Sequence, residues 1–276
     1  MWIAKTKAEL RARLDAASRP VILVQTMGAL HEGHASLISL AREMAGEEGT
    51  VVVTIFVNPI QFDRAGDLAT YPRPLAADLL VCETRGADGV FIPADGEMYF
   101  PDRSVTVIES SLSAHLCGAT RPGHFDGVCT VVLKLFLLSG CDAAVFGEKD
   151  FQQLAVIRRM VRDLDLRTEI IPHVTIREGD GLAMSSRNAR LTPEHRADAP
   201  RIRQALLAAA GASDATSMLR VAGEIIGASE FAKIDYLSLV DAETLAPTQN
   251  LANPAILACA VFYGEVRLID NIAVGC

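Results

Sequence analysis

Short apolar runs rich in β-branched residues recur along the first two thirds of the chain. They cover residues 21–24, 51–57, 90–92, 143–146 and 169–171. Runs of this length are typical of strands buried on both faces, as in a parallel sheet covered by helices. Between them, the spacing of apolar residues predicts helices over 33–44, 74–85, 127–138 and 150–164. Strands that alternate with helices in this way indicate an α/β domain with a doubly wound parallel sheet, of the Rossmann-like type.

The pattern changes beyond residue 187. A helix start at Thr192 leads into an Ala-rich helical region that runs to residue 226. Strand-like segments follow at 234–240, 256–263 and 265–269. Helices followed by consecutive strands predict a second, smaller α+β domain. We therefore expect a Rossmann-like domain at residues 1–187 and a small α+β domain at 188–276 that closes over the site of the first.

The net charge limits the kinds of macromolecule or membrane that we expect the protein to bind. The 276 residues include 34 acidic and 26 basic side chains, which gives a formal net charge of -8. A nucleic-acid binder needs clustered lysine and arginine to displace counterions from phosphates, and no run of basic residues offsets this deficit. An anionic membrane surface is disfavoured for the same reason. We expect neither nucleic acid nor a membrane as a partner.

The cysteines and the apolar stretches predict a cytoplasmic protein. Neither a CxxC motif nor a zinc-ligand spacing occurs among Cys82, Cys117, Cys129, Cys141, Cys259 and Cys276. They are typical of buried small hydrophobes in a reducing compartment. The first 20 residues lack the apolar core of a secretory signal. The most apolar stretch, residues 128–146, is interrupted by Lys134 and Asp142, which favours a buried helix and strand over a membrane span.

The candidate chemistry begins after the first predicted strand, because ligands of open parallel sheets bind beyond the carboxyl ends of the strands. That segment reads Met27, Gly28, Ala29, Leu30, His31, Glu32, Gly33 and His34. Backbone N–H groups and the dipole at a helix start attract phosphate, and imidazoles donate hydrogen bonds to phosphate oxygens. A zinc-protease helix is excluded, because it requires two histidines four positions apart. A merely structural turn stays open for either histidine alone.

Neutral amides follow the second predicted strand, at Asn58 and Gln61, and Tyr71 comes shortly after. An amide both donates and accepts hydrogen bonds without adding a charge to desolvate, which suits a ligand rich in hydroxyl and carboxylate oxygens. A simple turn at Asn58 and Pro59 is the alternative.

Charged residues open the helix after the fourth predicted strand. The segment contains Gly147, Glu148, Lys149, Asp150 and Gln153. Lys149 can pair with phosphate, and Asp150 can accept hydrogen bonds from ribose hydroxyls while capping the helix. An ordinary helix cap would explain Asp150, but it would not explain a lysine in the first turn, where the helix dipole disfavours a positive charge.

Two glycines and a cluster of polar residues follow the last predicted strand of this domain. Gly179 and Gly181 bracket a segment that we expect to be flexible, and Met184, Ser185, Ser186 and Arg187 come next. Two hydroxyls and an arginine are suited to closing over a triphosphate. The alternative is a solvated interdomain linker.

Together these segments resemble a known family. His31-x-Gly33-His34 and the later Met184-Ser185-Ser186-Arg187 resemble the two ATP signatures of the class I synthetase-like nucleotidyltransferases, the HxGH type. More narrowly, the chain resembles the pantothenate synthetase family in the order and spacing of residues 26–34, 56–62, 71–73, 121–127, 147–153, 180–188 and 267–271.

The resemblance implies an ATP-dependent condensation of (R)-pantoate with β-alanine, a step of coenzyme A biosynthesis. The pantoate carboxylate attacks the α-phosphorus of ATP to give pantoyl adenylate and diphosphate, and the β-alanine amine then displaces AMP to leave pantothenate. A negative nucleophile beside a triphosphate requires concentrated positive charge, which Mg²⁺, Lys149, Arg187 and the helix N-terminus would supply. The resemblance also implies a homodimer.

Residue roles follow from the resemblance, position by position. His34 resembles the proton donor to the departing phosphates, and His31, Lys149 and Arg187 complete the catalytic set. The implied ATP contacts are Met27, Gly28, Ala29, Leu30, His31, Glu32, Gly33, His34, Gly147, Glu148, Lys149, Asp150, Ile176, Met184, Ser185, Ser186 and Arg187. The implied pantoate ligands are Gln61 and Gln153, supported by Asn58 and Tyr71, and Gln61 also lies near β-alanine.

Three further candidates are Arg121, His124 and Asp78. The family often shows an acidic pair where this chain has only Asp78 after Ala76 and Ala77. We therefore expect Mg²⁺ to be held mainly by phosphate oxygens and water, with no assigned protein ligand.

Other functions compete with this interpretation. A nucleotidyltransferase that makes a dinucleotide or a nucleotide-lipid would need no amine acceptor, and a non-catalytic adenylate-binding regulator would need no charged catalytic groups. A class I aminoacyl-tRNA synthetase is disfavoured by the short, acidic chain. A nicotinamide-dependent oxidoreductase is disfavoured because no G-x-G-x-x-G follows the first strand.

Overall fold

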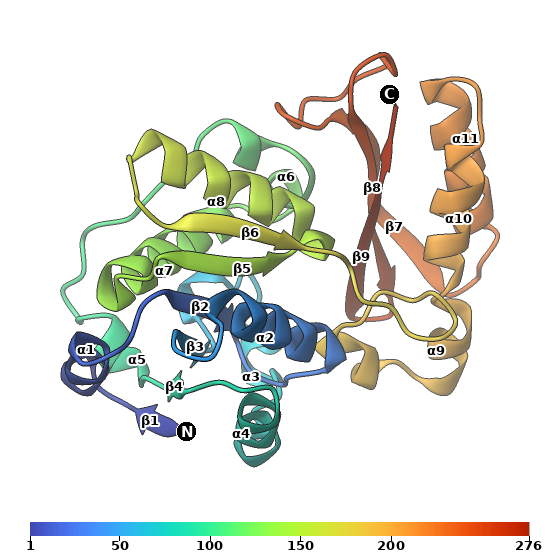
Figure 1. Cartoon of the computed structure of the whole chain (residues 1–276). Coiled ribbons are helices and arrows are strands. Elements are labelled where there is room, and N and C mark those ends of the chain that lie inside the picture. Colours follow the sequence, from blue (N-terminus) through green and yellow to red (C-terminus); the bar gives the residue numbers. More distant parts are fainter. Residues whose placement is uncertain (276) are drawn as a thin grey trace. The chain divides into compact units, whose positions relative to one another are not determined.

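A six-stranded parallel sheet forms the centre of the first part of the chain (Figure 1). The computed structural model describes residues 1–275, and the strands lie in the order β1-β4-β3-β2-β5-β6. Their bounds are β1 Trp2–Ala4, β2 Val21–Thr26, β3 Thr50–Ile55, β4 Gly89–Phe91, β5 Ala143–Gly147 and β6 Glu169–His173. This sheet confirms the predicted doubly wound α/β fold, and the five predicted strands correspond to β2 through β6.

Strand β1 was not predicted. It has only three residues and pairs in parallel with β4, with Trp2 opposite Gly89 and Ala4 opposite Phe91. A capping box at Thr6 and Glu9 starts the next helix two residues later. Three residues are too few to show an apolar period of their own, so the charged helix that follows dominated the sequence pattern.

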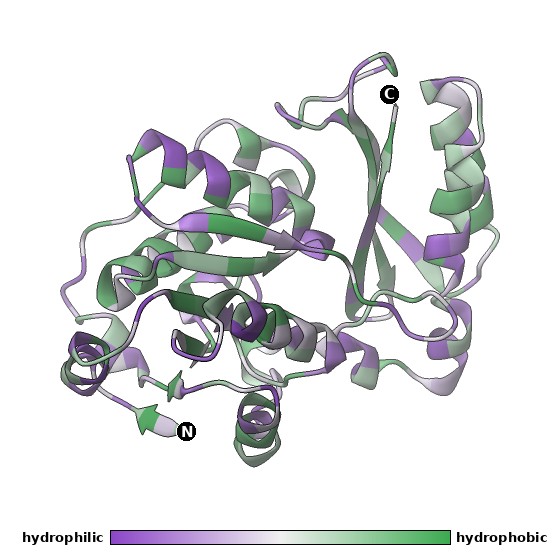
Figure 2. Ribbon diagram, viewed as in Figure 1, coloured by the Kyte–Doolittle hydropathy of each residue, from purple (hydrophilic) through white to green (hydrophobic). Residues whose placement is uncertain are grey.

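The four predicted helices agree with observed ones to within a few residues, namely α2 Glu32–Ala45, α4 Leu75–Thr84, α7 His124–Ser139 and α8 Phe151–Asp163. Three further helices were not predicted, namely α1 Lys7–Asp15, α3 Ala65–Ala69 and α5 Asp95–Met98. Helix α2 buries Ala35, Ile38, Ala41 and Ala45, which recur at steps of three and four residues and pack on the apolar side chains of the central strands. Figure 2 shows apolar residues along the strands and both classes of residue on the helices.

The strand order places the loops that carry the candidate chemistry. Strand β2 pairs with β3 on one side and with β5 on the other, so the chain reverses its direction of travel across the sheet at β2. Ligands of doubly wound sheets bind at such a switch point, beyond the carboxyl ends of the strands. The segment that starts at Met27 leaves the end of β2, and Gly147 ends the neighbouring β5.

A three-stranded antiparallel sheet organises the second part of the chain. Its order is β7-β8-β9, with bounds Ala232–Asp241, Ala255–Tyr263 and Val266–Val274. Three helices accompany it, namely α9 Pro193–Asp198, α10 Arg201–Ala210 and α11 Ala215–Gly227. Helix α11 packs on β7 and helix α10 on β8 and β9 around a buried core that includes Leu206, Ile226 and Leu257. Thr192 accepts a hydrogen bond from the His195 N–H, which confirms the predicted helix start.

The chain divides into two compact units along a different line from the predicted one. The first unit comprises residues 1–109, 122–148 and 156–174, and the second comprises 110–121, 149–155 and the chain from 175 onward. From sequence, we expected all residues up to 187 in the first domain. Residues 110–121 belong to the second unit because their helix α6, Leu116–Thr120, packs against β7 and β8. The short 3-10 helices are η1 Pro59–Gln61, η2 Leu112–Ala114, η3 Glu148–Asp150 and η4 Ser186–Arg190.

Two predicted features of the chain can be compared with the described residues. No helix among them combines the length and the apolar character that a bilayer crossing requires. The five cysteines within residues 1–275 are buried, as predicted, and are free thiols, while Cys276 lies outside the described residues.

The contact between β1 and β4 yields a prediction. A Cβ atom at Gly89 would overlap the ring of Trp2, which is the only tryptophan of the chain. We expect Gly89→Ala to shift the fluorescence emission of Trp2 and to lower the free energy of unfolding by about 1–3 kcal/mol, because the ring has to move. Gly96→Ala is the matched control, since nothing lies within 4 Å of a Cβ there. Unchanged emission and stability in Gly89→Ala would contradict this packing.

Candidate active site

Two histidines cap the start of α2 reciprocally. His31 is the N-cap residue, and its Nδ1 accepts a hydrogen bond from the Gly33 N–H at 3.1 Å. The Nδ1 of His34 accepts in turn from the His31 N–H at 3.4 Å, and the two ring centroids lie 4.2 Å apart. A neutral imidazole whose Nδ1 accepts carries its proton on Nε2. Both rings therefore present an Nε2–H donor at the N-terminus of a 14-residue helix.

A buried carboxylate holds the turn that precedes these histidines. Asp78, on α4, is only 1% exposed and accepts hydrogen bonds from the Ala29 N–H at 2.9 Å and the Leu30 N–H at 2.7 Å. Gly28 has φ of 81° and Ala29 has φ of 52°, so two consecutive residues adopt the left-handed region. A Cβ at Gly28 would lie 3.0 Å from the Asp78 Oδ2. Both Asp78 oxygens thus serve to hold the backbone of the turn.

Gln61 is positioned by a buried asparagine. The Asn58 Nδ2 donates to the Gln61 Oε1 at 2.9 Å and to the Gly127 carbonyl at 3.1 Å, and the Asn58 Oδ1 accepts from the Tyr99 hydroxyl at 2.7 Å. The side chain of Asn58 is committed within the protein, and the residue is 1% exposed. The Gln61 Nε2 donates to the Met27 Sδ at 3.3 Å, so Gln61 lies beside the segment that leads to the histidines.

Helix α7 fixes the backbone around Gln61. The His124 Nδ1 lies 2.8 Å from the Gln61 carbonyl oxygen, and a Cβ at Gly127 would lie 2.5 Å from the Ile60 carbonyl oxygen. Only glycine allows the helix to approach η1 so closely. Tyr71 is buried, and its ring packs edge-to-face on Phe62 at 5.8 Å. His124 and Tyr71 therefore lie where they support the segment that contains Gln61.

Lys149 is a half-buried cation in the second unit. Its carbonyl oxygen accepts a hydrogen bond from the Asn271 Nδ2 at 3.0 Å, which ties it to β9. Burial lowers the pKa of Lys149 below its usual value, and the positive charge of Arg187 acts in the same direction. Asp150 and Asp270 oppose this shift without cancelling it. The ammonium group therefore gains more from a bound anion than an exposed lysine would.

The segment expected to be flexible is closed by backbone hydrogen bonds. The Met184 N–H donates to the Ile176 carbonyl at 3.0 Å, and the Glu178 N–H donates to the Leu182 carbonyl at 2.8 Å. Gly181, with φ of 92°, makes the turn between them. The prediction of mobility from two glycines is therefore corrected, because Gly181 serves a tight turn.

Ion pairs brace the same hairpin. Arg177 makes a bidentate pair with Asp270 of β9, at 2.8 and 2.9 Å, and Asp270 is buried. Arg196 of α9 binds Glu178 and Asp180, each at 2.6 Å. Bidentate arginine pairs fix orientation as well as distance. The serine-rich segment that follows is thus presented by a rigid support.

The predicted site residues fall into both units. The first unit contains Met27 through His34, Asn58, Gln61, Tyr71, Asp78, His124, Gly147 and Glu148. The second contains Arg121, Lys149, Asp150, Gln153, Ile176, Met184, Ser185, Ser186 and Arg187. Glu32 makes an ion pair with Arg85, and the Ser185 Oγ accepts from the Arg187 N–H at 3.2 Å. Tyr99, which holds Asn58, was not predicted.

No metal-binding cluster is preformed in the described part of the chain. Within residues 1–275, no group of three or more His, Cys, Asp and Glu side chains is arranged to hold a metal ion. Asp78, the candidate carboxylate, already binds two backbone N–H groups. A cation would fit this chain only if a ligand supplied most of its oxygen donors.

Comparison with known proteins identifies the family. The sequence model of the family described as Pantoate-beta-alanine ligase matches residues 2–273. A pantothenate synthetase from Akkermansia muciniphila is 56% identical over 280 residues, which cover 99% of each chain. A pantothenate synthetase from Desulfovibrio desulfuricans is 47% identical over 284 residues, again with 99% of each chain covered.

Solved structures agree with the sequence relatives. The pantothenate synthetase from Thermus thermophilus has a TM-score of 0.94 and 44% identity over the whole of both chains. A pantoate-beta-alanine ligase from Francisella tularensis, complexed with beta-gamma ATP and beta-alanine, has a TM-score of 0.83 and 31% identity, with 99% and 97% of the chains covered. The chain therefore belongs to the pantoate-beta-alanine ligase family, and its function is the ATP-dependent formation of a C–N bond between pantoate and β-alanine.

Proposed function

We propose that the ligation proceeds through a pantoyl adenylate. The observation that carries this proposal is the reciprocal cap at the start of α2, which places two Nε2–H donors beside a helix N-terminus. Such a terminus favours a phosphate. The pantoate carboxylate oxygen attacks the α-phosphorus, the bond to diphosphate breaks, and the β-alanine amine then attacks the acyl carbon. AMP leaves with the bridging oxygen, and the amine loses its proton to solvent.

The proposed ATP contacts are the residues of the turn and helix start from Met27 to His34, together with Gly147, Glu148, Lys149, Asp150, Ile176 and the segment from Met184 to Arg187. His34 donates from Nε2 to the departing phosphate, and His31 orients it through the mutual cap. Lys149 and Arg187 neutralise the charge that develops on the phosphates. Asp78 acts indirectly, since its carboxylate holds the turn at Ala29 and Leu30.

Mg²⁺ is proposed as the cation that accompanies ATP. It would be held by phosphate oxygens and water. When bound, it supplies charge neutralisation on the phosphates. The chain itself contributes the positive charges of Lys149 and Arg187 to the phosphates.

Pantoate is proposed to bind Gln61 and Gln153, and β-alanine to lie near Gln61. Asn58 orients the Gln61 amide, and Tyr71 and His124 support its backbone. A neutral amide can bind a carboxylate or a hydroxyl without adding a charge to desolvate. The Francisella tularensis ligase is complexed with beta-gamma ATP and beta-alanine, which supports β-alanine as a ligand. Arg121 is a further candidate for contact with an anionic substrate.

The proposal also includes a compartment and an oligomeric state. Buried cysteines without disulfides suit the cytoplasm. A homodimer is proposed from the family resemblance alone.

An order-of-addition experiment tests the proposed function. Purified protein is incubated with ATP, Mg²⁺ and pantoate, and β-alanine is added afterwards. We expect free AMP and pantothenate to appear together only after the amine is supplied. A nucleotidyltransferase that makes dinucleotides would show no dependence on the amine, and a regulator would show no turnover. Either result would overturn the proposal.

Two substitutions test the roles of the two ring nitrogens of His34 separately. In His34→Asn the side-chain oxygen replaces Nδ1 and keeps the cap, but the Nε2–H donor is lost. In His34→Gln the amide nitrogen replaces Nε2, but the cap is lost. We expect His34→Asn to lower the rate of diphosphate release by about 10²–10⁴-fold and His34→Gln to retain more activity. Glu43→Ala, exposed on the same helix, is the control. The reverse order of activities would assign His34 a purely structural role.

Lys149 predicts an alkaline limb in the pH profile. Its pKa is lowered by burial, so the charge is complete at low pH and disappears as the pH rises through a value below that of an ordinary lysine. We expect kcat/KM for ATP to fall in that range. Lys149→Arg keeps its charge and should lack this limb, whereas Lys233→Arg, exposed in the same unit, should show the wild-type profile. Persistence of the limb in Lys149→Arg would rule out Lys149 as its source.

A further inference from the structure

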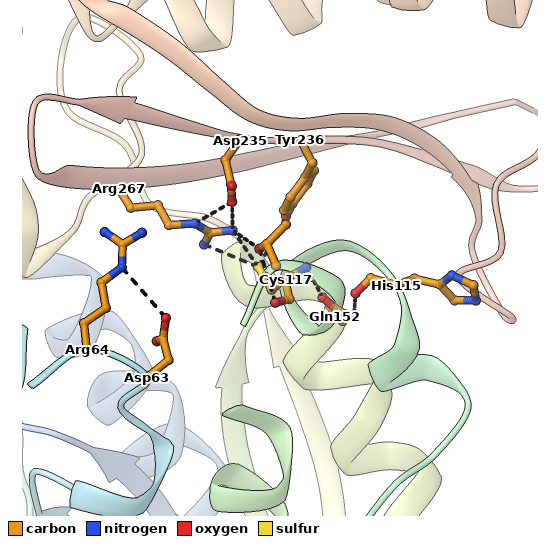
Figure 3. A network of polar contacts seen from close by, with 9 residues as sticks. Asp63, Arg64, His115, Cys117, Gln152, Asp235, Tyr236 and Arg267 are labelled. Carbon is orange, nitrogen blue, oxygen red and sulfur yellow. Dashed lines mark hydrogen bonds and ion pairs between the residues drawn. The ribbon is translucent and has the colours of Figure 1, made fainter. Parts of the chain in front are cut away.

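Arg267 joins the antiparallel sheet of the second unit to helix α6 (Figure 3). From β9, its Nε and Nη2 donate to the Asp235 Oδ2 of β7 at 2.9 and 2.8 Å. Its Nη1 and Nη2 also lie 3.5 and 3.6 Å from the Cys117 Sγ, and Nη2 donates to the Thr120 Oγ1 at 3.3 Å. One guanidinium group thus contacts β7, which lies on the far side of β8, and two residues of α6.

The surroundings of Arg267 keep its contacts in place. The Cys117 Sγ lies 3.4 Å from the Tyr236 hydroxyl, and the Tyr236 ring centroid lies 5.6 Å from the Arg267 Cζ. Burial raises the pKa of Tyr236 well above its ordinary value, so the phenol keeps its proton. Burial alone would lower the pKa of Arg267, but Cys117 and Asp235 outweigh burial and raise this pKa above its ordinary value. Arg267 is a permanent, paired cation with donors left for α6.

Gln152 continues this connection to the first turn of α8. Its Oε1 accepts from the Cys117 N–H at 2.8 Å, and its Nε2 donates to the Leu112 carbonyl at 2.9 Å and to the His115 carbonyl at 2.6 Å. The residue is 5% exposed. The Gln152 amide therefore holds the segment 112–117. Arg267 contacts the same segment at Cys117.

The fixed side chain of Gln152 restricts the direction in which the side chain of its neighbour Gln153 points. Successive side chains on an α-helix point about 100° apart, so a side chain locked at one position fixes the rotation of the turn. The start of this stretch is held as well, because the Asn271 Nδ2 of β9 donates to the Lys149 carbonyl. Two residues of β9 thus act on this stretch at different points: Asn271 holds Lys149 directly, whereas Arg267 reaches Gln152 through Cys117.

We propose that Arg267 and Gln152 are positioning residues for the carboxylic acid substrate, acting through the segment 112–120 to orient Gln153. This inference rests on the proposed contact between Gln153 and pantoate. A merely structural role would lower stability and leave the KM of the folded enzyme unchanged. A positioning role raises the KM for the acid selectively, because a misplaced amide loses contact with the acid and not with ATP.

Arg267→Lys and Gln152→Glu test the proposal. A lysine can pair with Asp235 but cannot span Cys117 and Thr120 as a planar guanidinium does. A glutamate keeps the acceptor for the Cys117 N–H but loses both donors. For each variant we expect faster hydrogen exchange in peptides covering 112–121 and a KM for pantoate raised by about tenfold, with the KM for ATP changed by less than about twofold. Arg220→Lys, at an exposed ion pair with Glu224 in the same unit, should change none of these values.

The outcomes separate the inference from the function on which it rests. Unchanged exchange in 112–121 would overturn the connection through Cys117. Equal changes in both KM values, or a loss of stability alone, would overturn the positioning role. Gln153→Ala tests the underlying contact independently: an unchanged KM for pantoate in that variant would refute the proposed substrate contact, while the exchange data would still report on the brace.

Discussion

The constraint on which the structure depends is the need to bring a carboxylate and a triphosphate together inside an acidic protein. Like charges repel, and a net charge of -8 gives no general attraction for either anion. Binding of either anion therefore depends on the local electrostatic field and not on the net charge. In the proposed site, the first unit contributes the N-terminus of α2 with its two Nε2–H donors, and the second contributes Lys149 and Arg187, whose positive charge lowers the pKa of Lys149.

Buried polar side chains keep these groups in position. Asp78 holds the turn before the histidines, Asn58 holds the amide of Gln61, and Asp270 holds Arg177 at the base of the hairpin before Ser185. A buried carboxylate or amide is costly unless its hydrogen bonds are made, so each of these residues fixes one local geometry. Groups held this way need little reorganisation when charge develops on the phosphates.

Sequence pattern predicted most of the fold because β2, β3 and β5 are long, apolar and uninterrupted. It missed β1, which is too short to show a period, and it could not assign 110–121 and 149–155 to the second unit, since that depends on packing between distant segments. The candidate site was predicted from residues placed after strands, and its substrate contacts stay a prediction. The contacts that support the site were not predicted: Tyr99 contacts Asn58 across 41 positions, and the Asp78 bond to the Leu30 N–H spans 48. Gly181 was assigned flexibility where the chain makes a braced turn.

In the proposed reaction, the pantoate carboxylate attacks the α-phosphorus of ATP and AMP leaves with the bridging oxygen. Turnover of pantoate labelled with ¹⁸O in its carboxylate, followed by mass spectrometry of the products, tests this central claim directly. One labelled oxygen should appear in the phosphate of AMP, and the other should stay in the amide of pantothenate. Unlabelled AMP, or label in inorganic phosphate formed together with ADP, would contradict the claim.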